Sequence, residues 1–539
     1  MKIAIAQVNL CVGAIAANTD TVLSNIEKAR KEGAGLVVFP ELTLTSYPPE
    51  DLLLREDLYR QIDIAMEQLR VASKEIGVIY GFPEKTQEGL FNTCVYIKDG
   101  AELCRYRKRA LPNYGVFDEK RYFEPGDSAV IFDLDSIPTS MSICEDIWTD
   151  EPALNAASKG AALLININAS PYHARKLNER EHVARERAMQ SGLDILYVNL
   201  VGGQDELVFD GGSMIVNSKG DIVYRAPHFE EGLYLVEVNM GDDGLLYHPE
   251  HPSLPEPGKL SDIYSALVMG VRDYVHKNGF KGAVLGLSGG IDSALTLAVA
   301  VDALGSENVE VLVMPSRYSA SMSAEDAISM AEGLNVNYTV LSIEEPVAAF
   351  NELLGPLFRD LPSDATEENI QARCRGILLM ALSNKTGKLL LTTGNKSEMS
   401  VGYATLYGDM AGGFAPLKDL SKLLTYDLSR WINEQKTIIP QRIIDRPPSA
   451  ELRPDQKDED SLPPYEILDP ILERYIELDE SPETIIASGF DRETVLHVTG
   501  LVDRNEYKRR QAAPGVRITK RAFGRDRRYP ITSGYREEL

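Results

Sequence analysis

The chain has 539 residues, too many for one ordinary hydrophobic core, and this length predicts two or three domains. Its formal net charge of −25 argues against nonspecific nucleic-acid binding. No apolar run approaches the roughly 20 residues that span a bilayer, and the N-terminus lacks the regions of a signal peptide. These features predict a soluble, cytoplasmic protein that has neither a membrane nor a nucleic acid as partner.

The five cysteines are scattered along the chain without CxxC spacing, so neither a disulfide framework nor a zinc site is expected. A cysteine with a special role would therefore act as a nucleophile. Basic residues are concentrated in one stretch, 508–528, which contains a single acid, Asp526. This stretch supplies the local positive charge that an anionic substrate would need on an acidic protein.

Residues 1–245 are predicted to form the first domain, because short apolar strands recur along them with helical segments between. The strand-like stretches include KIAIAQV, GLVVFPE, SMSICEDIW and LYLVEVN. This pattern predicts a layered α/β or α+β domain. Residues 246–262, rich in Pro, Gly and charge, are predicted to be a linker.

Residues 263–539 are predicted to form a second domain, in which apolar strands alternate with helices. This alternation predicts a doubly wound parallel sheet, whose ligands bind at the carboxyl ends of the strands. The motifs SGGIDS, MPSRYS and TTGNKSE all follow predicted strands. A polar, Pro-rich stretch at about 446–461 is expected to be a loop that orders on binding.

The stretch 283–301 contains an apolar strand, a turn of small residues and an apolar helix. Gly289 and Gly290 let the backbone approach a ligand, and the helix N-terminus adds positive potential, which together make a phosphate cradle. The serines at both ends of SGGIDS offer hydroxyls, and Asp292 can hold the Mg²⁺ of a nucleotide triphosphate. An ordinary strand-to-helix turn is the simpler alternative. The stretch resembles the PP-loop of ATP pyrophosphatases, which adenylate a carbonyl or carboxyl group.

Glu41, Lys108 and Cys144 form the candidate catalytic group of the first domain. A thiol is a good nucleophile only when deprotonated, and a glutamate base with a nearby lysine meets that need. Each residue alone has an ordinary structural explanation. Together, in this order, they resemble the nitrilase-like carbon-nitrogen hydrolases, which implies a four-layer α-β-β-α sandwich and a Glu-Lys-Cys triad.

That resemblance implies a role for each residue. Glu41 would be the general base, Cys144 the nucleophile that forms a thioester, and Lys108 the stabiliser of the tetrahedral oxyanion. Glu119 matches a second glutamate that many of these enzymes keep near the triad.

The flanking sequences resemble the glutaminase version of this fold. In that version Tyr114, Ser170 and Lys176 match positions that hold glutamine. A cation for the carboxylate of an amino acid and acceptors for its ammonium group are what such a substrate requires. Purely structural roles for Tyr114 and Ser170 are the alternative.

Four residues of the second domain are candidate ligand contacts. Asn369 and Arg373 are four residues apart on a predicted helix and so share a face. Glu398 can join Asp292 at a metal, and Lys422 can meet a phosphate. An amphipathic helix exposed to solvent is the alternative for the first pair.

Five motifs together resemble the glutamine-dependent NAD synthetase family over nearly the whole chain: SGGIDSA, ENIQAR, TTGNKSEMSVGYATLYGDMAGGFAPLKDLSK, PPSAELRPDQKDEDSLPPYEILD and EYKRRQAAPG. This resemblance implies adenylation of the nicotinate carboxylate of deamido-NAD by ATP with Mg²⁺, followed by attack of ammonia from L-glutamine. It also implies a homo-oligomer, at least a dimer, and a tunnel that shields ammonia. Other PP-loop amidotransferases, and a nitrilase-type amidase fused to a regulatory module, are the rival interpretations.

The same resemblance assigns the nucleotide contacts. The ATP contacts implied are Gly286, Leu287, Ser288, Gly289, Gly290, Ile291, Asp292, Ser293 and Thr393. Asn369, Glu398 and Lys508 match contacts to deamido-NAD, and Arg373 and Lys422 are assigned to the same ligand. Glu398 is also a candidate metal ligand with Asp292, and the sequence leaves open whether it binds metal, substrate or both.

Overall fold

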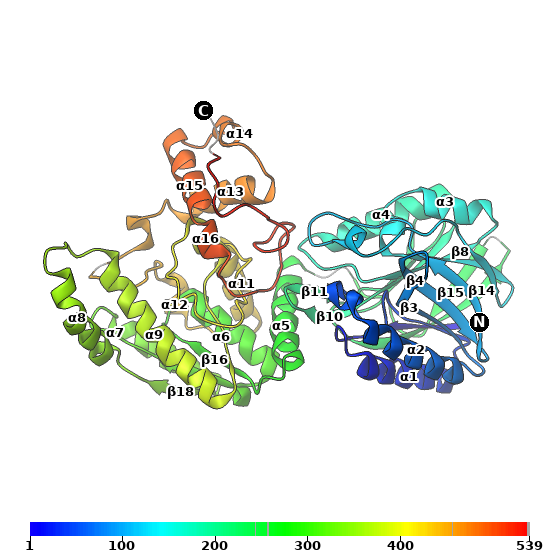
Figure 1. Ribbon diagram of the computed structural model, residues 1–539, viewed down its shortest axis with the longest axis horizontal. Helices are drawn as coiled ribbons and strands as arrows, with labels where there is room; N and C mark the ends of the chain where they lie inside the picture. The colour runs from blue at the N-terminus through cyan, green and yellow to red at the C-terminus, as the bar shows by residue number, and fades with distance from the viewer. Residues whose placement is uncertain (243, 256–257, 455, 536–539) are drawn as a thin grey trace. The chain divides into compact units, whose positions relative to one another are not determined.

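The computed structural model describes residues 1–535 except 243, 256–257 and 455. The chain divides into two compact units, Met1–Lys259 and Leu260–Leu539 (Figure 1). The predicted linker, 246–262, includes the end of strand β15 (Gly244–Pro249) and the start of helix α5 (Lys259–Lys277), and its residues 256–257 lie outside the described part. None of the described helices is long and apolar enough to cross a membrane.

Two sheets form the centre of the first unit, with orders β15-β14-β1-β2-β3-β4-β5 and β13-β12-β9-β8-β7-β6. The strands of the first sheet, besides β15, are β1 (Lys2–Gln7), β2 (Leu36–Val38), β3 (Gly77–Lys85), β4 (Leu90–Lys98), β5 (Ala101–Arg107) and β14 (Gly232–Gly241). Those of the second are β6 (Ile131–Leu134), β7 (Ile137–Ile143), β8 (Leu163–Asn168), β9 (Asp194–Asn199), β12 (Met214–Val216) and β13 (Ile222–Arg225). A hairpin, β10 (Val201–Gln204) and β11 (Leu207–Asp210), and helices α1 (Ile15–Lys31), α2 (Glu56–Ala72), α3 (Glu151–Ser158) and α4 (Lys176–Ser191) complete the unit.

These elements stack in four layers. Because side chains alternate along a strand, Ile3 of β1 packs in a cluster with Ile165 of the second sheet, whereas Ala4 packs in a cluster with Val22 of α1. A third cluster joins Ala184 of α4 to the outer face of the second sheet. The predicted α-β-β-α sandwich is therefore confirmed (Figure 1).

The second unit contains a parallel sheet of order β18-β17-β16-β19. Its strands are β16 (Ala283–Gly286), β17 (Val309–Val313), β18 (Asn337–Val340) and β19 (Leu389–Leu390). The chain adds β17 and β18 on one side of β16 and later adds β19 on the other side. Open parallel sheets bind their ligands where the strand order reverses in this way, which is here between β16 and β19.

Helices connect the successive strands, so the predicted doubly wound parallel sheet is also confirmed. A separate apolar cluster joins Met399, Leu468 and Val498 from three of the later helices. Besides α5, the helices are α6 (Ile291–Leu304), α7 (Ser321–Gly333), α8 (Glu344–Phe358), α9 (Ala365–Thr386), α10 (Lys396–Val401), α11 (Lys422–Gln435), α12 (Gln441–Asp445), α13 (Tyr465–Leu472), α14 (Pro482–Ala487), α15 (Arg492–Arg504) and α16 (Glu506–Arg509).

Candidate active sites

A buried ion-pair network in the first unit joins three of the predicted catalytic residues. Glu41 follows β2 and Lys108 follows β5, so both lie beyond strand ends of the same sheet. The Lys108 ammonium donates to Glu41 Oε1 at 2.8 Å and to Glu119 Oε1 at 2.7 Å, and its side chain is fully buried. A lysine ammonium has three donors, so one remains for a ligand once these two carboxylates are satisfied.

Glu41 is held in place by two further donors. The Asn92 side-chain amide donates to Glu41 Oε1 at 2.8 Å, and the backbone N–H of Ala169 donates to Glu41 Oε2 at 2.9 Å. Hydrogen bonds to an ionised acceptor are stronger than neutral ones. The position of this carboxylate is therefore fixed from several directions before any substrate arrives.

Cys144 begins a short 3₁₀ turn (Cys144–Ile147) directly after β7, and its φ of 43° lies in the left-handed region. A non-glycine residue in that region stores strain that tends to mark functional turns. Burial, and next the negative charge of Glu41, raise the pKa of the Cys144 thiol well above its usual value, while Lys108 opposes the shift. The resting nucleophile is therefore a thiol that needs a base, and Glu41 is the carboxylate whose charge raises the pKa of this thiol most.

Glu119 differs from Glu41 in its surroundings. Burial, opposed by the Lys108 ammonium and reinforced by Glu41, raises the pKa of Glu119 to about 7. The hydroxyl of Tyr47 donates to Glu119 Oε1 at 3.0 Å, whereas Oε2 is buried and has no hydrogen-bond partner among the described residues. Glu119 can therefore gain or lose a proton near neutral pH.

Asp146, two residues after the candidate nucleophile, is a positioning residue that the sequence analysis missed. Its carboxylate accepts from the backbone N–H groups of Arg109, Ala110 and Ile143 at 2.7–3.0 Å and from the Tyr106 hydroxyl at 2.8 Å. These bonds tie the segment after Lys108 to the turn that presents Cys144. The only sign of this role in the sequence is an acidic residue two positions after the candidate nucleophile.

The three predicted glutamine contacts lie on different segments. The Tyr114 hydroxyl donates to Glu145 Oε1 at 2.9 Å, which adds Glu145, next to the nucleophile, to the candidate contacts. The Lys176 ammonium lies over the ring of Trp148, the residue directly after this turn, 3.8 Å from the ring centroid. The structure thus brings Tyr114 and Lys176 close to the turn that begins at Cys144.

Ser170, the third predicted contact, is already engaged. Its hydroxyl accepts from Arg180 Nε at 3.1 Å, and the Arg180 guanidinium pairs with buried Asp210 at 2.7 Å. Ser170 is almost fully buried. This network fixes the hydroxyl in place. A purely structural role for Ser170 therefore agrees with its contacts as well as a role in glutamine binding does.

The PP-loop of the second unit turns sharply between β16 and α6. Gly289 has a φ of 80°, and a Cβ there would lie 2.2 Å from the Ser323 carbonyl oxygen, so only glycine fits. The hydroxyls of Ser288 and Ser293 lie 3.1 Å apart, and the Gly290 N–H donates to Ser288 Oγ at 3.2 Å. These serines therefore stabilise the turn itself.

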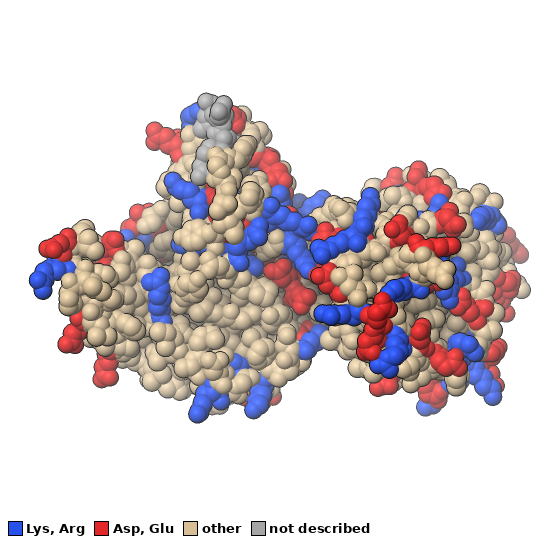
Figure 2. All heavy atoms as spheres, viewed as in Figure 1, with Lys and Arg blue, Asp and Glu red and all other residues tan. Residues whose placement is uncertain are grey.

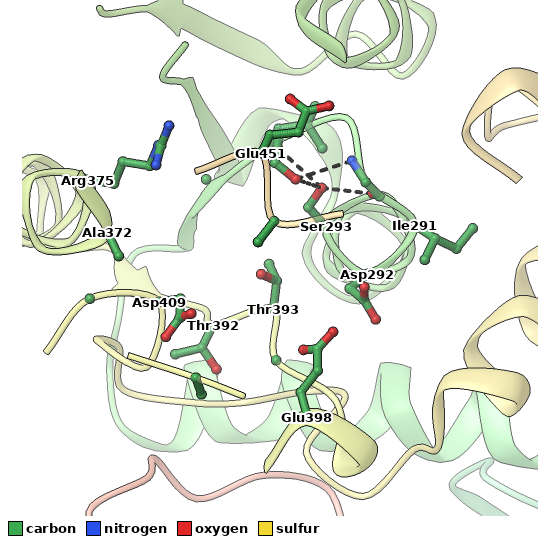
Figure 3. A pocket seen from close by; sticks show the side chains of 18 of the residues that line it. Ile291, Asp292, Ser293, Ala372, Arg375, Thr392, Thr393, Glu398, Asp409 and Glu451 are labelled. Atoms are coloured by element: carbon green, nitrogen blue, oxygen red, sulfur yellow. Dashed lines mark hydrogen bonds between the residues drawn. The ribbon is translucent and has the colours of Figure 1, made fainter. Parts of the chain in front are cut away.

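A cavity of about 300 Å³ opens at this turn, where the strand order of the sheet reverses. Arg375 of α9 and Thr392 after β19 line it opposite the PP-loop (Figure 3). The predicted site residues that line it are Gly286, Leu287, Ser288, Gly290, Ile291, Asp292, Ser293, Thr393, Glu398 and Lys422.

Two carboxylates in the cavity share one ammonium group. Asp292, at the start of α6, and Glu398, in α10, point toward the same part of the cavity (Figure 3). Lys422 Nζ donates to Asp292 Oδ2 at 2.6 Å and to Glu398 Oε1 at 3.0 Å. Burial acts to lower the pKa of Lys422, but the charges of Asp292 and Glu398 outweigh it and raise the pKa well above its usual value.

This donor set fits Mg²⁺, which proteins hold with one or two carboxylates and substrate phosphates. Mg²⁺ at this position would neutralise charge on the phosphate oxygens. None of the described residues form a cluster of three or more His, Cys, Asp or Glu that could hold a metal alone.

Residues 446–452 line the same cavity. The Arg446 guanidinium donates to the Gly289 carbonyl oxygen at 2.7 Å, and Glu451 accepts from the Ser323 hydroxyl at 2.6 Å. This part of the stretch that was expected to order on binding therefore lies against the PP-loop, through contacts that its Pro-rich composition did not reveal.

Asn369, Arg373 and Lys508 are not among the described residues that line the cavity, but they meet on one neighbouring segment, 402–406. Asn369 Oδ1 accepts from the Thr405 hydroxyl at 2.8 Å, and Arg373 Nε donates to a carbonyl of this segment at 3.3 Å. Lys508 Nζ donates to two of its carbonyls, at 2.7 and 2.8 Å. Because this segment also contributes Tyr403 to the cavity wall, the three residues support one side of the cavity.

The two sites define a class of protein: a thiol hydrolase of the nitrilase type joined to a PP-loop nucleotide-binding unit. The carbon-nitrogen hydrolase family model matches residues 2–244, and the NAD synthase family model matches residues 263–512. The chain belongs to the glutamine-dependent NAD(+) synthetase family, as its full-length relatives show.

Those relatives are similar from end to end. The enzyme of Acinetobacter baylyi is 48% identical, with 100% of this chain and 99% of the relative covered. The enzyme of Thermotoga maritima is 43% identical, with 100% of both covered. The solved structure of the glutamine-dependent NAD+ synthetase of Acinetobacter baumannii in complex with ADP is 46% identical, with a TM-score of 0.80 over 100% of this chain and 99% of that chain.

Proposed function

We propose that this chain makes NAD from deamido-NAD, ATP and L-glutamine, releasing AMP, pyrophosphate and glutamate. The observation that carries the proposal is the presence, in one chain, of a buried Glu41–Lys108–Cys144 site and a PP-loop cavity with a carboxylate pair. The first site can release ammonia from an amide, and the second can activate a carboxylate. Membership of the family supports the pairing of these two chemistries.

In the first unit, Cys144 Sγ attacks the side-chain amide carbon of glutamine while its proton passes to Glu41. The oxyanion that forms is stabilised by the free donor of Lys108. Collapse of the tetrahedral intermediate breaks the C–N bond, and Glu41 returns the proton so that ammonia leaves. Water then attacks the thioester, which yields glutamate and restores the thiol.

In the second unit, the nicotinate carboxylate of deamido-NAD attacks the α-phosphorus of ATP, and pyrophosphate leaves. Asp292 and Glu398 would hold Mg²⁺ there, and the ion would offset the charge of the triphosphate. The PP-loop N–H groups at the start of α6 would cradle phosphate oxygens. Neutral ammonia then attacks the acyl carbon, the acyl-adenylate bond breaks, and AMP leaves.

The proposal includes a homo-oligomer, at least a dimer. Helix α8 has no buried residue along its length and exposes Leu353 and Leu357, which are 74% and 72% exposed. Ile377 and Met380 of α9 are also exposed, and few charged side chains lie over α9 in Figure 2. Apolar surface of this kind is typical of an interface, so a second copy of the chain is the occupant that these helices favour.

Mass-spectrometric detection of NAD tests the function directly. Purified protein incubated with deamido-NAD, ATP, Mg²⁺ and glutamine is expected to form NAD and AMP in equal amounts. Omission of ATP or of every nitrogen source serves as the control and should give no NAD. Formation of AMP and pyrophosphate with a different carboxylate, and not with deamido-NAD, would instead identify another PP-loop amidotransferase.

The lowered pKa of Lys176 predicts how glutamine binding depends on pH. Burial, with a contribution from Arg180, lowers the pKa of Lys176 to about 8. A lowered lysine pKa means that the ammonium is present below that pH and lost above it, so the KM for glutamine is expected to rise between about pH 7.5 and 9. Glutamate release measured against pH tests this. Lys176→Arg should keep its charge and move the rise to higher pH, and an unchanged KM in the unsubstituted protein would remove Lys176 from the glutamine site.

A further inference from the structure

Lys422 lies where a divalent cation of the nucleotide site would lie. Its ammonium is 2.6 Å from Asp292 Oδ2 and 3.0 Å from Glu398 Oε1, and its side chain is only 3% exposed. The second oxygen of Asp292, Oδ1, accepts from the Asn395 side-chain amide at 2.8 Å. The two carboxylates thus converge on one positive charge, as they would on a metal ion.

The backbone of Lys422 is anchored independently of its ammonium group. Lys422 is the first residue of α11, and its backbone N–H donates to Ser397 Oγ at 2.9 Å. The Ser397 hydroxyl in turn donates to Asp469. The anchored end of the residue is therefore fixed, while four rotatable methylenes separate it from the ammonium.

Charge balance explains why the ammonium sits between the carboxylates. Two carboxylates buried in the same cavity repel each other unless a cation lies between them. Among the described residues, Lys422 is the cation that hydrogen-bonds to both Asp292 and Glu398. A Mg²⁺ ion and this ammonium cannot occupy one position, because they compete for the same carboxylate oxygens.

We propose that Lys422 occupies the divalent-cation position of the nucleotide-free site and is exchanged for Mg²⁺ when ATP binds. This inference rests on the proposed function of the cavity and deepens it. The metal enters with the nucleotide rather than before it, because the triphosphate supplies additional negative charge that holds both cations. The displaced ammonium then lies beside the PP-loop, within the cavity where the phosphates bind.

The exchange predicts a gain of metal binding when Lys422 is removed. Mn²⁺ titrations of the full-length, nucleotide-free protein, followed by electron paramagnetic resonance, measure this without any turnover. Lys422→Met is expected to bind Mn²⁺ about tenfold more tightly or better than the unsubstituted protein, since it removes a positive charge next to both ligands. Equal Mn²⁺ affinity in the two proteins would overturn the proposal.

Matched variants show whether the gain in Mn²⁺ affinity comes from this site or from the loss of any lysine. Lys388→Met removes a lysine that pairs with Glu310 at 3.2 Å outside the cavity lining, and it should leave Mn²⁺ affinity unchanged. Lys422→Met combined with Glu398→Gln should lose the gained affinity. A gain that persists in this double variant would place the Mn²⁺ elsewhere and overturn the proposal.

If Lys422→Met folds poorly, thermal unfolding of a second variant tests the same exchange. Lys422→Gln keeps hydrogen-bond donors without the charge, and Mn²⁺ alone should raise its Tm more than it raises that of the unsubstituted protein. Equal Tm increases contradict the exchange. Both readouts need no NAD formation, so loss of the proposed activity and loss of the exchange are distinguishable outcomes.

Discussion

Replacing Cys144 with alanine is expected to abolish NAD formation supported by glutamine while leaving NAD formation supported by ammonium salts. The substitution removes the sulfur that is proposed to form the thioester, so the glutamine-supported rate should fall by about 10³-fold or more. The PP-loop cavity is lined by residues of the second unit and does not include Cys144. NAD formation measured in parallel with glutamine and with ammonium chloride tests the separation of the two chemistries.

Cys104→Ala is the matched control for this experiment. Cys104 lies in β5, is partly exposed, and burial raises the pKa of its thiol to about 11. It has no contact with Glu41 or Lys108 among the described hydrogen bonds, so its loss should leave both rates unchanged. Equal loss with glutamine and ammonium in Cys144→Ala would contradict the assignment of separate sites.

The buried strands are the part of the fold that the sequence predicts best. KIAIAQV and ALLININAS are nearly continuous apolar runs, and β1 and β8 lie there with almost every side chain buried. Strand β5 is not predicted from the sequence, because its residues, AELCRYR, are mostly exposed or half-buried. Because β5 is an edge strand with β4 as its neighbour in the sheet, polar residues are tolerated on it and erase the apolar signal.

In the candidate sites too, part of the structure cannot be predicted from the sequence, but for a different reason. Residue type and a family resemblance are enough to select Glu41, Lys108 and Cys144 as candidate catalytic residues. Neither reveals that Asn92 orients Glu41 from 51 residues away, or that Asp146 joins the two loops that present Lys108 and Cys144. Contacts between distant segments leave no periodicity in the sequence, so only the folded chain reports them.

At the PP-loop site, the sequence selects candidate residues but does not reveal how they are arranged relative to one another. Asp292 and Glu398 are predicted as metal ligands and Lys422 as a phosphate contact. The structure joins all three in one cluster, although Lys422 and Asp292 are 130 residues apart. This arrangement makes the charge of Asp292 important both for the resting site and for binding of the nucleotide.

Asp292→Asn is therefore expected to stop pyrophosphate release from ATP in the presence of deamido-NAD, with a loss of about 10²-fold or more. Asparagine keeps the shape of the side chain and removes its charge, so that a buried Lys422 is left with Glu398 as its ion-pair partner. Pyrophosphate measured with saturating ATP, and then across Mg²⁺ concentrations, separates loss of metal binding from loss of chemistry.

The control for this variant lies on the same helix. Asp302 of α6 accepts from the Tyr264 hydroxyl at 2.6 Å and is not among the described residues that line the cavity, so Asp302→Asn should release pyrophosphate at the normal rate. If Asp292→Asn also retains that rate, Glu398 and the PP-loop N–H groups must position the nucleotide without Asp292. High Mg²⁺ that restores the rate of Asp292→Asn would instead assign the carboxylate to metal binding, because excess metal offsets a weakened ligand.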